Sequence, residues 1–217
     1  NVGNISSIKP SIINEGTEII VSNIFNNVPA RKKFLKSESY EFRKIIKIVK
    51  CYALCYNKID FILTHNEKKV LSTRSSDLKT RIISILGKDC NNKLMELSYT
   101  KDNISVYGFI GNLSLVKKRR SNQYFFLNKI YIKNKLVDIT IYNSFYTLVQ
   151  RGEYPFYIIF LDLKPNLYDI NVHPKKLEVK FSNELKIQHV IKASISNQLK
   201  NISRFIPDYY VNTSLNY

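Results

Sequence analysis

The 217-residue sequence has no tryptophan, a single methionine and only six glycines, which are scattered along the chain. A Gly-rich phosphate loop needs several glycines close together, so this chain by itself cannot wrap a nucleotide. The three cysteines, Cys51, Cys55 and Cys90, form no Cys-x-x-Cys pair, and their odd number argues against a disulfide framework. We expect them to be reduced thiols packed in the interior.

Histidine is also scarce, with only His65, His173 and His189. None of them stands in a serine or cysteine hydrolase pattern, and the sequence has neither a His-x-x-x-His pair nor a Cys/His cluster. No apolar run approaches the roughly twenty residues that a membrane span needs, and the sequence does not open with a signal peptide. These absences disfavour nucleophilic catalysis, a metal centre and a membrane protein. We expect a cytosolic protein.

Basic residues outnumber acidic residues by 34 to 17, which gives the chain a net charge of +17. An excess of this size favours a polyanionic partner such as nucleic acid. The abundance of Lys, Asn, Ile and Tyr is also typical of AT-rich coding sequences, so genomic composition is a second possible source of the charge. Charge alone therefore does not decide the function.

Apolar residues at three-and-four spacing predict an amphipathic helix over about residues 38–56. A second helix is predicted in the segment SSDLKTRIISILG, residues 75–87, because Ser and Asp stand where a helix cap is needed and Gly87 provides a stop. Further helices are predicted over 135–149 and 183–205. We place a domain junction beside the second helix, which gives domains 1–75 and 76–205 and a frayed tail 206–217.

Apolar runs bounded by turn residues predict strands between these helices. The predicted strands are 16–25, 58–65, 104–111, 123–132 and 155–163. Because strands and helices interleave, the fold class is α/β or α+β.

The segment Asp169 to Phe181 reads DINVHPKKLEVKF and combines a rigid His-Pro corner with a strand-like alternation. The alternation places Leu177, Val179 and Phe181 on one face and Lys176, Glu178 and Lys180 on the other. Lys176 is thus presented at the mouth of a strand, in a position suited to reach a phosphate. The alternative interpretation is an edge strand with ordinary solvated lysines.

Three stretches occur in a characteristic order: GTEIIVSNIFNNVPARKKFLKS, RRSNQYFFLN and DINVHPKKLEVKF. Together they resemble the MutL family of DNA mismatch-repair proteins, over most of residues 16–181. The resemblance implies an α+β fold, a two-layer α/β sandwich. It would comprise the end of an ATPase domain of the gyrase, Hsp90, histidine-kinase and MutL (GHKL) type, followed by a transducer domain with a ribosomal-protein-like β-α-β fold.

The resemblance also implies site residues. Gly16 and Thr17 match the last nucleotide motif of the family, where Thr backs the adenine pocket, although Gly-Thr before a strand is in itself a common turn. Lys176 matches the transducer lysine that reaches the γ-phosphate of ATP, and Lys175 fills a variable position beside it. Pro29, Ala30 and Arg31 match a signature that we interpret as a scaffold. The magnesium helix, the adenine site and the lid would precede Asn1, so ATP and Mg²⁺ would be bound mainly by that part.

Charge and resemblance together indicate residues that face DNA. They are Lys117, Lys118, Arg119 and Arg120 in one loop, and Lys129, Lys133 and Lys135 farther along. Phosphate contacts of this kind bind duplex with little sequence preference and strong salt dependence. Each of these side chains taken singly could also be a solvated surface charge.

The expected function is that of a MutL-type switch in mismatch repair and the DNA damage response. It would bind and hydrolyse ATP together with the missing half, form a homodimer or pair with a paralogue on ATP binding, and act with double- and single-stranded DNA and a mismatch-recognition protein of MutS type. Two alternatives are a basic nucleic-acid-binding module without nucleotide chemistry and a type II topoisomerase-like ATPase/transducer fragment. Nuclease activity is not implied. One departure from the family pattern is Asn128-Lys129 in place of Asn-Gly, for which we expect a different type of turn.

Overall fold

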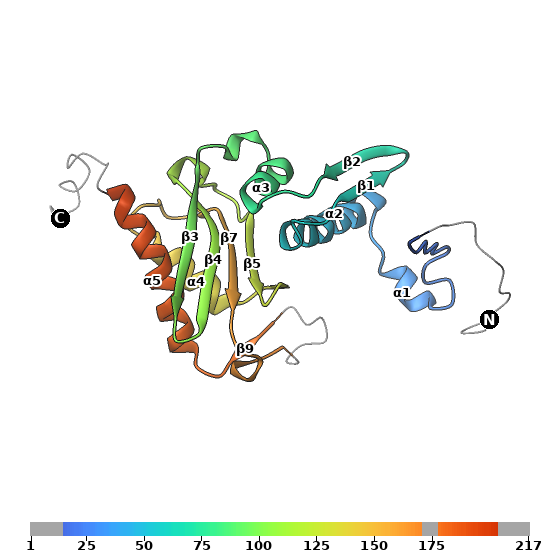
Figure 1. Ribbon diagram of the computed structural model, residues 1–217. Helices are drawn as coiled ribbons and strands as arrows, with labels where there is room; N and C mark the ends of the chain where they lie inside the picture. Colours follow the sequence, from blue (N-terminus) through green and yellow to red (C-terminus); the bar gives the residue numbers. More distant parts are fainter. Residues whose placement is uncertain (1–14, 171–177, 204–217) are drawn as a thin grey trace. The chain divides into compact units, whose positions relative to one another are not determined.

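The computed structural model describes residues 15–170 and 178–203, and side chains up to residue 200 (Figure 1). The chain forms two compact units, Asn1–Lys44 and Ile45–Tyr217. The domain boundary that we place after residue 75 stays a prediction.

The first unit contains the short helix α1 (Pro29–Lys33), with proline in its first turn, and the beginning of α2 (Glu38–Cys55). The predicted strand over 16–25 is wrong: residues 17–22 have no regular structure, and the side chains of Ile19 and Ile20 are 80% and 79% exposed. A strand needs a hydrogen-bonded neighbour, and no strand in the described part of the chain pairs with this segment. Positive φ angles of 51° at Asn23 and 64° at Phe25 then take the backbone out of the extended conformation that a strand requires.

The predicted helix over 38–56 is confirmed as α2, Glu38–Cys55. Glu38 and Glu41 lie in its first turn, where negative charge is favourable. The backbone N–H of Lys36 donates to Glu41 Oε1 over 3.2 Å, and this hydrogen bond is the main cause that lowers the pKa of Glu41. The sequence pattern and the hydrogen bond to Glu41 therefore both place the start of this helix near residue 38.

A five-stranded mixed sheet forms the centre of the second unit, in the order β3-β4-β7-β5-β6 (Figure 1). Its strands are β3 (Leu94–Lys101), β4 (Ile104–Gly111), β5 (Gln123–Leu127), β6 (Ile130–Ile132) and β7 (Tyr157–Asp162). β5 and β7 are parallel neighbours, and the chain crosses between them through β6 and α4 (Lys135–Ser144), which makes a β-α-β unit. The other pairings are antiparallel. The α+β class is confirmed.

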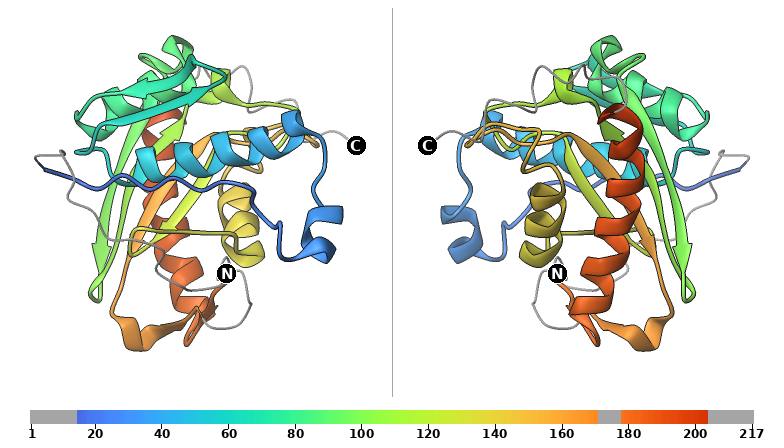
Figure 2. Two further views of the ribbon diagram at one scale, coloured as in Figure 1. Left: turned by 90° about the vertical axis from the view of Figure 1, so that its right-hand side faces the viewer. Right: turned by 90° about the vertical axis from the view of Figure 1, so that its left-hand side faces the viewer.

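Two helices, α4 and α5 (Glu184–Ser203), cover one face of the sheet (Figure 2). Their contact with the sheet is a core of buried aliphatic and aromatic residues that includes Phe125, Ile141, Ile159 and Ile191. The opposite face packs against the end of α2, the hairpin β1 (Phe61–His65) and β2 (Lys68–Thr73), and α3 (Leu78–Leu86). The sheet is therefore covered by apolar packing on both faces.

Arg81 on α3 is fully buried and joins the elements of this second layer. Nη1 donates to Ala53 O at 3.1 Å and Thr73 Oγ1 at 2.8 Å. Nη2 donates to three carbonyl oxygens, those of Asn57 at 2.8 Å, Ile59 at 2.7 Å and Arg74 at 2.9 Å. Burial lowers the pKa of Arg81, whereas the charge of Asp60 raises it. One side chain thus ties the end of α2, the hairpin and α3 together.

The cap signals of α3 are confirmed, because Asp77 Oδ1 accepts from Thr80 N–H at 2.9 Å and Gly87 stops the helix with φ 110°. The predicted helix over 135–149 is too long. It ends at Ser144, after Asn143, and both are weak helix formers. The helix predicted over 183–205 is α5.

Three strands were not predicted: β2, β3 and β8 (Tyr168–Asp169), which pairs with β9 (Lys180–Phe181) at the end of the segment predicted to alternate like a strand. Short 3₁₀ turns occupy Lys88–Cys90, Leu113–Leu115 and Pro165–Leu167. None of the helices in the described ranges is long and apolar enough to cross a membrane.

The hairpin turn at Asn128-Lys129 is also different from the expectation. Both residues have positive φ, 44° and 66°, as two-residue type I′ turns require, so the turn keeps the geometry that Asn-Gly would give. Asn128 is held by its side chain, which accepts from Leu163 N–H at 3.0 Å and donates to Leu163 O at 2.9 Å and Tyr168 Oη at 2.8 Å. The carbonyl of Lys129 accepts from the Cys55 thiol at 2.9 Å. These contacts stabilise a lysine where glycine is usual.

The cysteine prediction is confirmed, because Cys51, Cys55 and Cys90 are free and buried. Burial raises the pKa of Cys51 and of Cys55 to about 11, so both thiols are protonated at neutral pH.

Candidate nucleic-acid interface

The basic loop Lys117–Arg120 lies between the 3₁₀ turn Leu113–Leu115 and β5, and all four of its side chains are exposed. Its first residue is fixed through the backbone: Lys117 N–H donates to Tyr154 O at 3.1 Å, and Tyr154 N–H donates to Lys117 O at 2.8 Å. The loop is therefore anchored at one end while its charged side chains remain in solvent.

Arg120 of this loop has two side-chain partners. Its guanidinium lies 5.1 Å from the centroid of the Tyr154 ring, and its Nη1 lies 3.7 Å from Asp138 Oδ2. Asp138 Oδ1 in turn accepts from the hydroxyl of Tyr157 at 2.7 Å. Burial, followed by the charge of Asp138, raises the pKa of Tyr157, so the phenol remains a donor. Arg120 is thus oriented by a carboxylate that is itself held.

Three cations from distant parts of the sequence meet around one hollow of about 290 Å³. They are Lys47 of α2, Arg120 of the loop and Lys133, which follows β6. The same hollow is lined by Asp138 and by tyrosine rings. Lys47 was not among the predicted site residues, because a lysine on the polar side of a helix looks like an ordinary solvated charge.

Lys133 also borders a second, more open hollow at the start of α4. Lys135 and Lys180 line this second hollow together with the carboxylates of Glu178 and Glu184. Asn134 caps α4 by accepting from Val137 N–H at 3.0 Å, and its amide donates to Val179 O at 2.9 Å. The cap fixes the backbone between Lys133 and Lys135, so the two lysines have a defined position.

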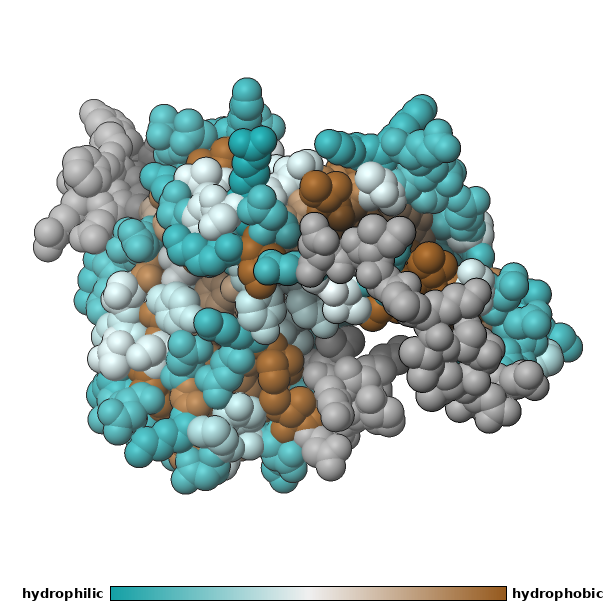
Figure 3. Space-filling model, turned by 45° about the vertical axis from the view of Figure 1, so that its right-hand side comes forward, coloured by the Kyte–Doolittle hydropathy of each residue, from teal (hydrophilic) through white to brown (hydrophobic). Residues whose placement is uncertain are grey.

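Of the predicted DNA-facing residues, Arg120 and Lys133 line the first hollow together with Lys47, and Lys133 and Lys135 line the second together with Lys180. Lys117, Lys118 and Arg119 share the loop but line neither hollow, and Lys129 lines another. On the face drawn in Figure 3, hydrophilic side chains cover most of the described surface, and hydrophobic side chains form separate patches. Exposed ammonium and guanidinium groups at fixed positions can contact phosphates without reading bases.

The predicted nucleotide residues have less structural support. Gly16 and Thr17 lie in the first unit and are exposed, and a Cβ built at Gly16 would meet no atom within 4 Å. Lys175 and Lys176 lie outside the described residues. The predicted alternation is confirmed where it can be followed, because Val179 and Phe181 are buried while Glu178 and Lys180 are exposed. The roles of Gly16, Thr17 and Lys176 stay predictions.

Within residues 15–170 and 178–203, no group of three or more His, Cys, Asp and Glu side chains could hold a metal ion.

Comparison with known proteins places these features in a family. Residues 82–200 match the family model described as DNA mismatch repair protein, C-terminal domain. The chain is 40% identical over 200 residues to the DNA mismatch repair protein MutL of Clostridium acetobutylicum, covering 92% of this chain and 32% of that protein. It is 38% identical over 196 residues to MutL of Parabacteroides distasonis, covering 90% and 32%. The chain thus spans about a third of the length of these relatives.

Solved structures show the same fold. The N-terminal domain of a DNA repair protein superposes with a TM-score of 0.68 at 24% identity, over 84% of this chain and 61% of that one. The Aquifex aeolicus MutL ATPase domain complexed with ADP superposes with a TM-score of 0.53 at 23% identity, over 79% and 55%. Family model, relatives and fold agree that the chain belongs to the MutL family of DNA mismatch-repair proteins.

Proposed function

We propose that this chain forms the DNA-contacting part of a MutL-type switch, and that it does so through the cations around the two hollows beside α4. The observation that carries the proposal is the convergence of Lys47, Arg120 and Lys133 around one hollow, from three separate segments. Solvated charges scattered by genomic composition have no reason to converge. The contacts would be to phosphates of double- or single-stranded DNA, without sequence preference.

The test is the salt dependence of binding to a labelled duplex, followed by fluorescence anisotropy. Each phosphate contact that is removed should reduce the slope of log K against log salt by about one. We expect this from Lys47→Ala and from Lys133→Ala. Lys68→Ala, which removes an exposed lysine of β2 that lines neither hollow, is the matched control. Equal slopes for all three variants would show that the net charge of +17 binds DNA diffusely and that the hollows have no special role.

We further propose that ATP controls this part when it is joined to the rest of the ATPase domain. Support comes from the sequence match of Gly16, Thr17 and Lys176 to family nucleotide motifs. In this proposal Thr17 backs the adenine pocket and the ammonium of Lys176 lies against the γ-phosphate. Mg²⁺, held by ligands from the rest of the protein, would neutralise phosphate charge. Lys176 can help to stabilise the charge that develops on the phosphate during hydrolysis.

Steady-state ATP hydrolysis by the full-length protein tests this second proposal. Lys176→Ala should lose most of the activity, while Lys175→Ala, its neighbour, should keep it. Equal activity in both variants would remove the role of Lys176. DNA binding that ATP does not affect would then favour a basic binding module without nucleotide chemistry.

Dimerisation on ATP binding and action with a MutS-type protein belong to the same proposal. They would couple the nucleotide state to DNA contact, because a cation that reaches the terminal phosphate interacts with it only while ATP is present. Light scattering of the full-length protein with and without a non-hydrolysable ATP analogue tests this; an unchanged mass would contradict it.

A further inference from the structure

One row of side chains crosses all five strands of the sheet on the face opposite α4 and α5. The strand registers place these residues side by side: Tyr131, Phe126, Phe160, Tyr107 and Ser98, from β6 to β3. Four of the five are aromatic, and the row ends at the edge strand β3 in a serine.

The rings form a continuous stack. Phe126 and Phe160 have centroids 4.7 Å apart and planes at 13°, and Phe160 and Tyr107 are 5.1 Å apart at 10°. Tyr131 closes the other end against the Phe126 ring, edge-on at 5.9 Å. At β3 the next place in the row holds Ser98, which is exposed and has no ring. The stack therefore stops one place short of the sheet edge.

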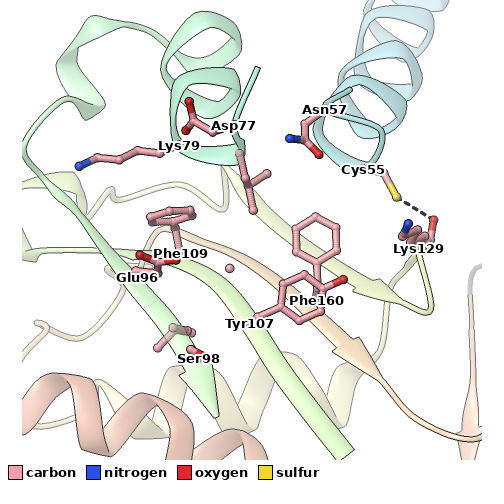
Figure 4. Close-up of a pocket in the computed structure, with 13 residues that line it drawn as sticks. Cys55, Asn57, Asp77, Lys79, Glu96, Ser98, Tyr107, Phe109, Lys129 and Phe160 are labelled. Atoms are coloured by element: carbon pink, nitrogen blue, oxygen red, sulfur yellow. Dashed lines mark hydrogen bonds between the residues drawn. The ribbon is translucent and has the colours of Figure 1, made fainter. Parts of the chain in front are cut away.

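A hollow of about 540 Å³ lies over this end of the row. Figure 4 shows Tyr107 and Phe109 of β4 and Glu96 and Ser98 of β3 on the sheet side of it, and Asp77, the cap residue before α3, above them. Tyr107 is half-buried, and burial raises its pKa to about 12, with Asp162 contributing through its charge and a side-chain hydrogen bond. The Tyr107 ring is thus neutral, held by Phe160 on one side and by Asp162 at its hydroxyl.

The charges of this hollow differ from those of the basic interface. Two carboxylates, Asp77 and Glu96, and two ammonium groups, Lys79 and Lys129, line it, in a chain with net charge +17. Asp77 is engaged as the cap of α3. Glu96 is exposed and points from the same face of β3 as Ser98, two residues away. A carboxylate therefore lies next to the vacant place in the stack.

We propose that this hollow binds the guanidinium group of an arginine side chain presented by a partner protein. A guanidinium is flat and cationic, so it can continue the stack over Tyr107 while its N–H groups donate to the carboxylate of Glu96. A lysine ammonium is charged but not planar, so it cannot stack on Tyr107. An uncharged aromatic ring can stack but offers no positive charge to Glu96. A nucleotide would bring its phosphate toward Glu96, which is unfavourable. This inference does not rest on the proposed DNA or ATP functions.

The experiment is a titration of the isotope-labelled chain with N-acetyl-arginine methylamide, followed by backbone amide chemical shifts. We expect saturable shifts around Ser98 and Tyr107. The matching lysine derivative has no planar group to stack on Tyr107, and the tryptophan derivative has no charge for Glu96, so each should bind about fivefold more weakly. Ser98→Trp, which puts a ring into the vacant place from an exposed position, should abolish binding, and Glu96→Gln should weaken it about fivefold.

Glu67→Gln is the control, since Glu67 is an exposed carboxylate of the β1–β2 turn outside this hollow. It should leave binding unchanged. If the arginine derivative still caused saturable chemical-shift changes in Ser98→Trp, the proposed location of the binding site would be wrong. Equal binding of the tryptophan and arginine derivatives, with no effect of Glu96→Gln, would overturn the choice of a cation. The spectra report folding of every variant, and the two surface substitutions at β3 avoid disturbing the buried stack.

Discussion

Replacing Gly108 by alanine should strongly destabilise the second unit. Gly108 lies in β4 with φ 126°, a region in which residues with a side chain are strained by about 1–3 kcal/mol. A Cβ there would lie 2.2 Å from Ile158 O and 3.3 Å from Ile159 Cα, both backbone atoms of the central strand β7. Overpacking of this kind typically costs about 1–3 kcal/mol more. The sum, about 2–6 kcal/mol, is a large part of the roughly 5–15 kcal/mol by which native domains are stable.

Gly87→Ala provides the control for the strain part alone. Gly87 has φ 110°, but a Cβ there meets no atom within 4 Å, so only the backbone cost of about 1–3 kcal/mol applies. Urea unfolding followed by circular dichroism measures both variants, and equal m-values would confirm that stability alone has changed. If Gly108→Ala cost no more than Gly87→Ala, the close approach of β4 and β7 would be wrong.

Three further predictions follow from buried groups and from the interface. Arg81→Leu should lower the free energy of unfolding by about 3 kcal/mol or more, because it leaves several buried carbonyl groups without their donor; a loss below about 1 kcal/mol in urea unfolding would contradict this. Asp138→Asn should tighten DNA binding about twofold to fivefold at low salt, because it removes a negative charge and releases Arg120; weaker binding in anisotropy would contradict it. Burial raises the pKa of Cys51 and Cys55 from 9.0 to about 11, so the stability from the protonated thiols is complete below the pKa of an unfolded thiol and is lost as pH rises toward 11. The loss is at most about 1.4 kcal/mol per pH unit for each thiol. Urea unfolding over this range should show a shallower decline in the Cys51→Ala, Cys55→Ala double variant, and identical declines would refute the shift.

Elements whose first and last residues contain capping signals could be predicted from the sequence. The helix α3 was predictable from Asp77 and Gly87 because both act within one turn of the chain. The strand predicted over 16–25 failed for the opposite reason: its apolar residues indicate a buried strand only if another strand lies beside it, and none in the described ranges does. β3 was missed although Met95, Leu97 and Tyr99 alternate with polar residues, which is a detectable edge-strand pattern.

The candidate interface was predictable only in part. A run of four cations between 117 and 120 is visible in the sequence, but which of them is oriented depends on Asp138 and Tyr154, more than fifteen residues away along the chain. Lys47 illustrates the same limit, since only the packing of α2 against the sheet brings it to Lys133. Arg81 had a local signal, a basic residue beside the apolar positions of a helix, but its acceptors are backbone carbonyls that no sequence pattern specifies.

The aromatic row connects the two candidate binding regions without mixing their chemistry. Tyr131, at the β6 end, lines the hollow of Lys47, Arg120 and Lys133, whereas Tyr107, at the β4 end, lines the hollow of Glu96. Phosphates would be attracted to the first end, where cations predominate, and gain little at the second, where carboxylates balance lysines. A DNA duplex at the first hollow and an arginine-bearing partner at the second would therefore lie at opposite ends of the aromatic row and would not compete for the same charges. The packed rings between them link the two hollows through one sheet.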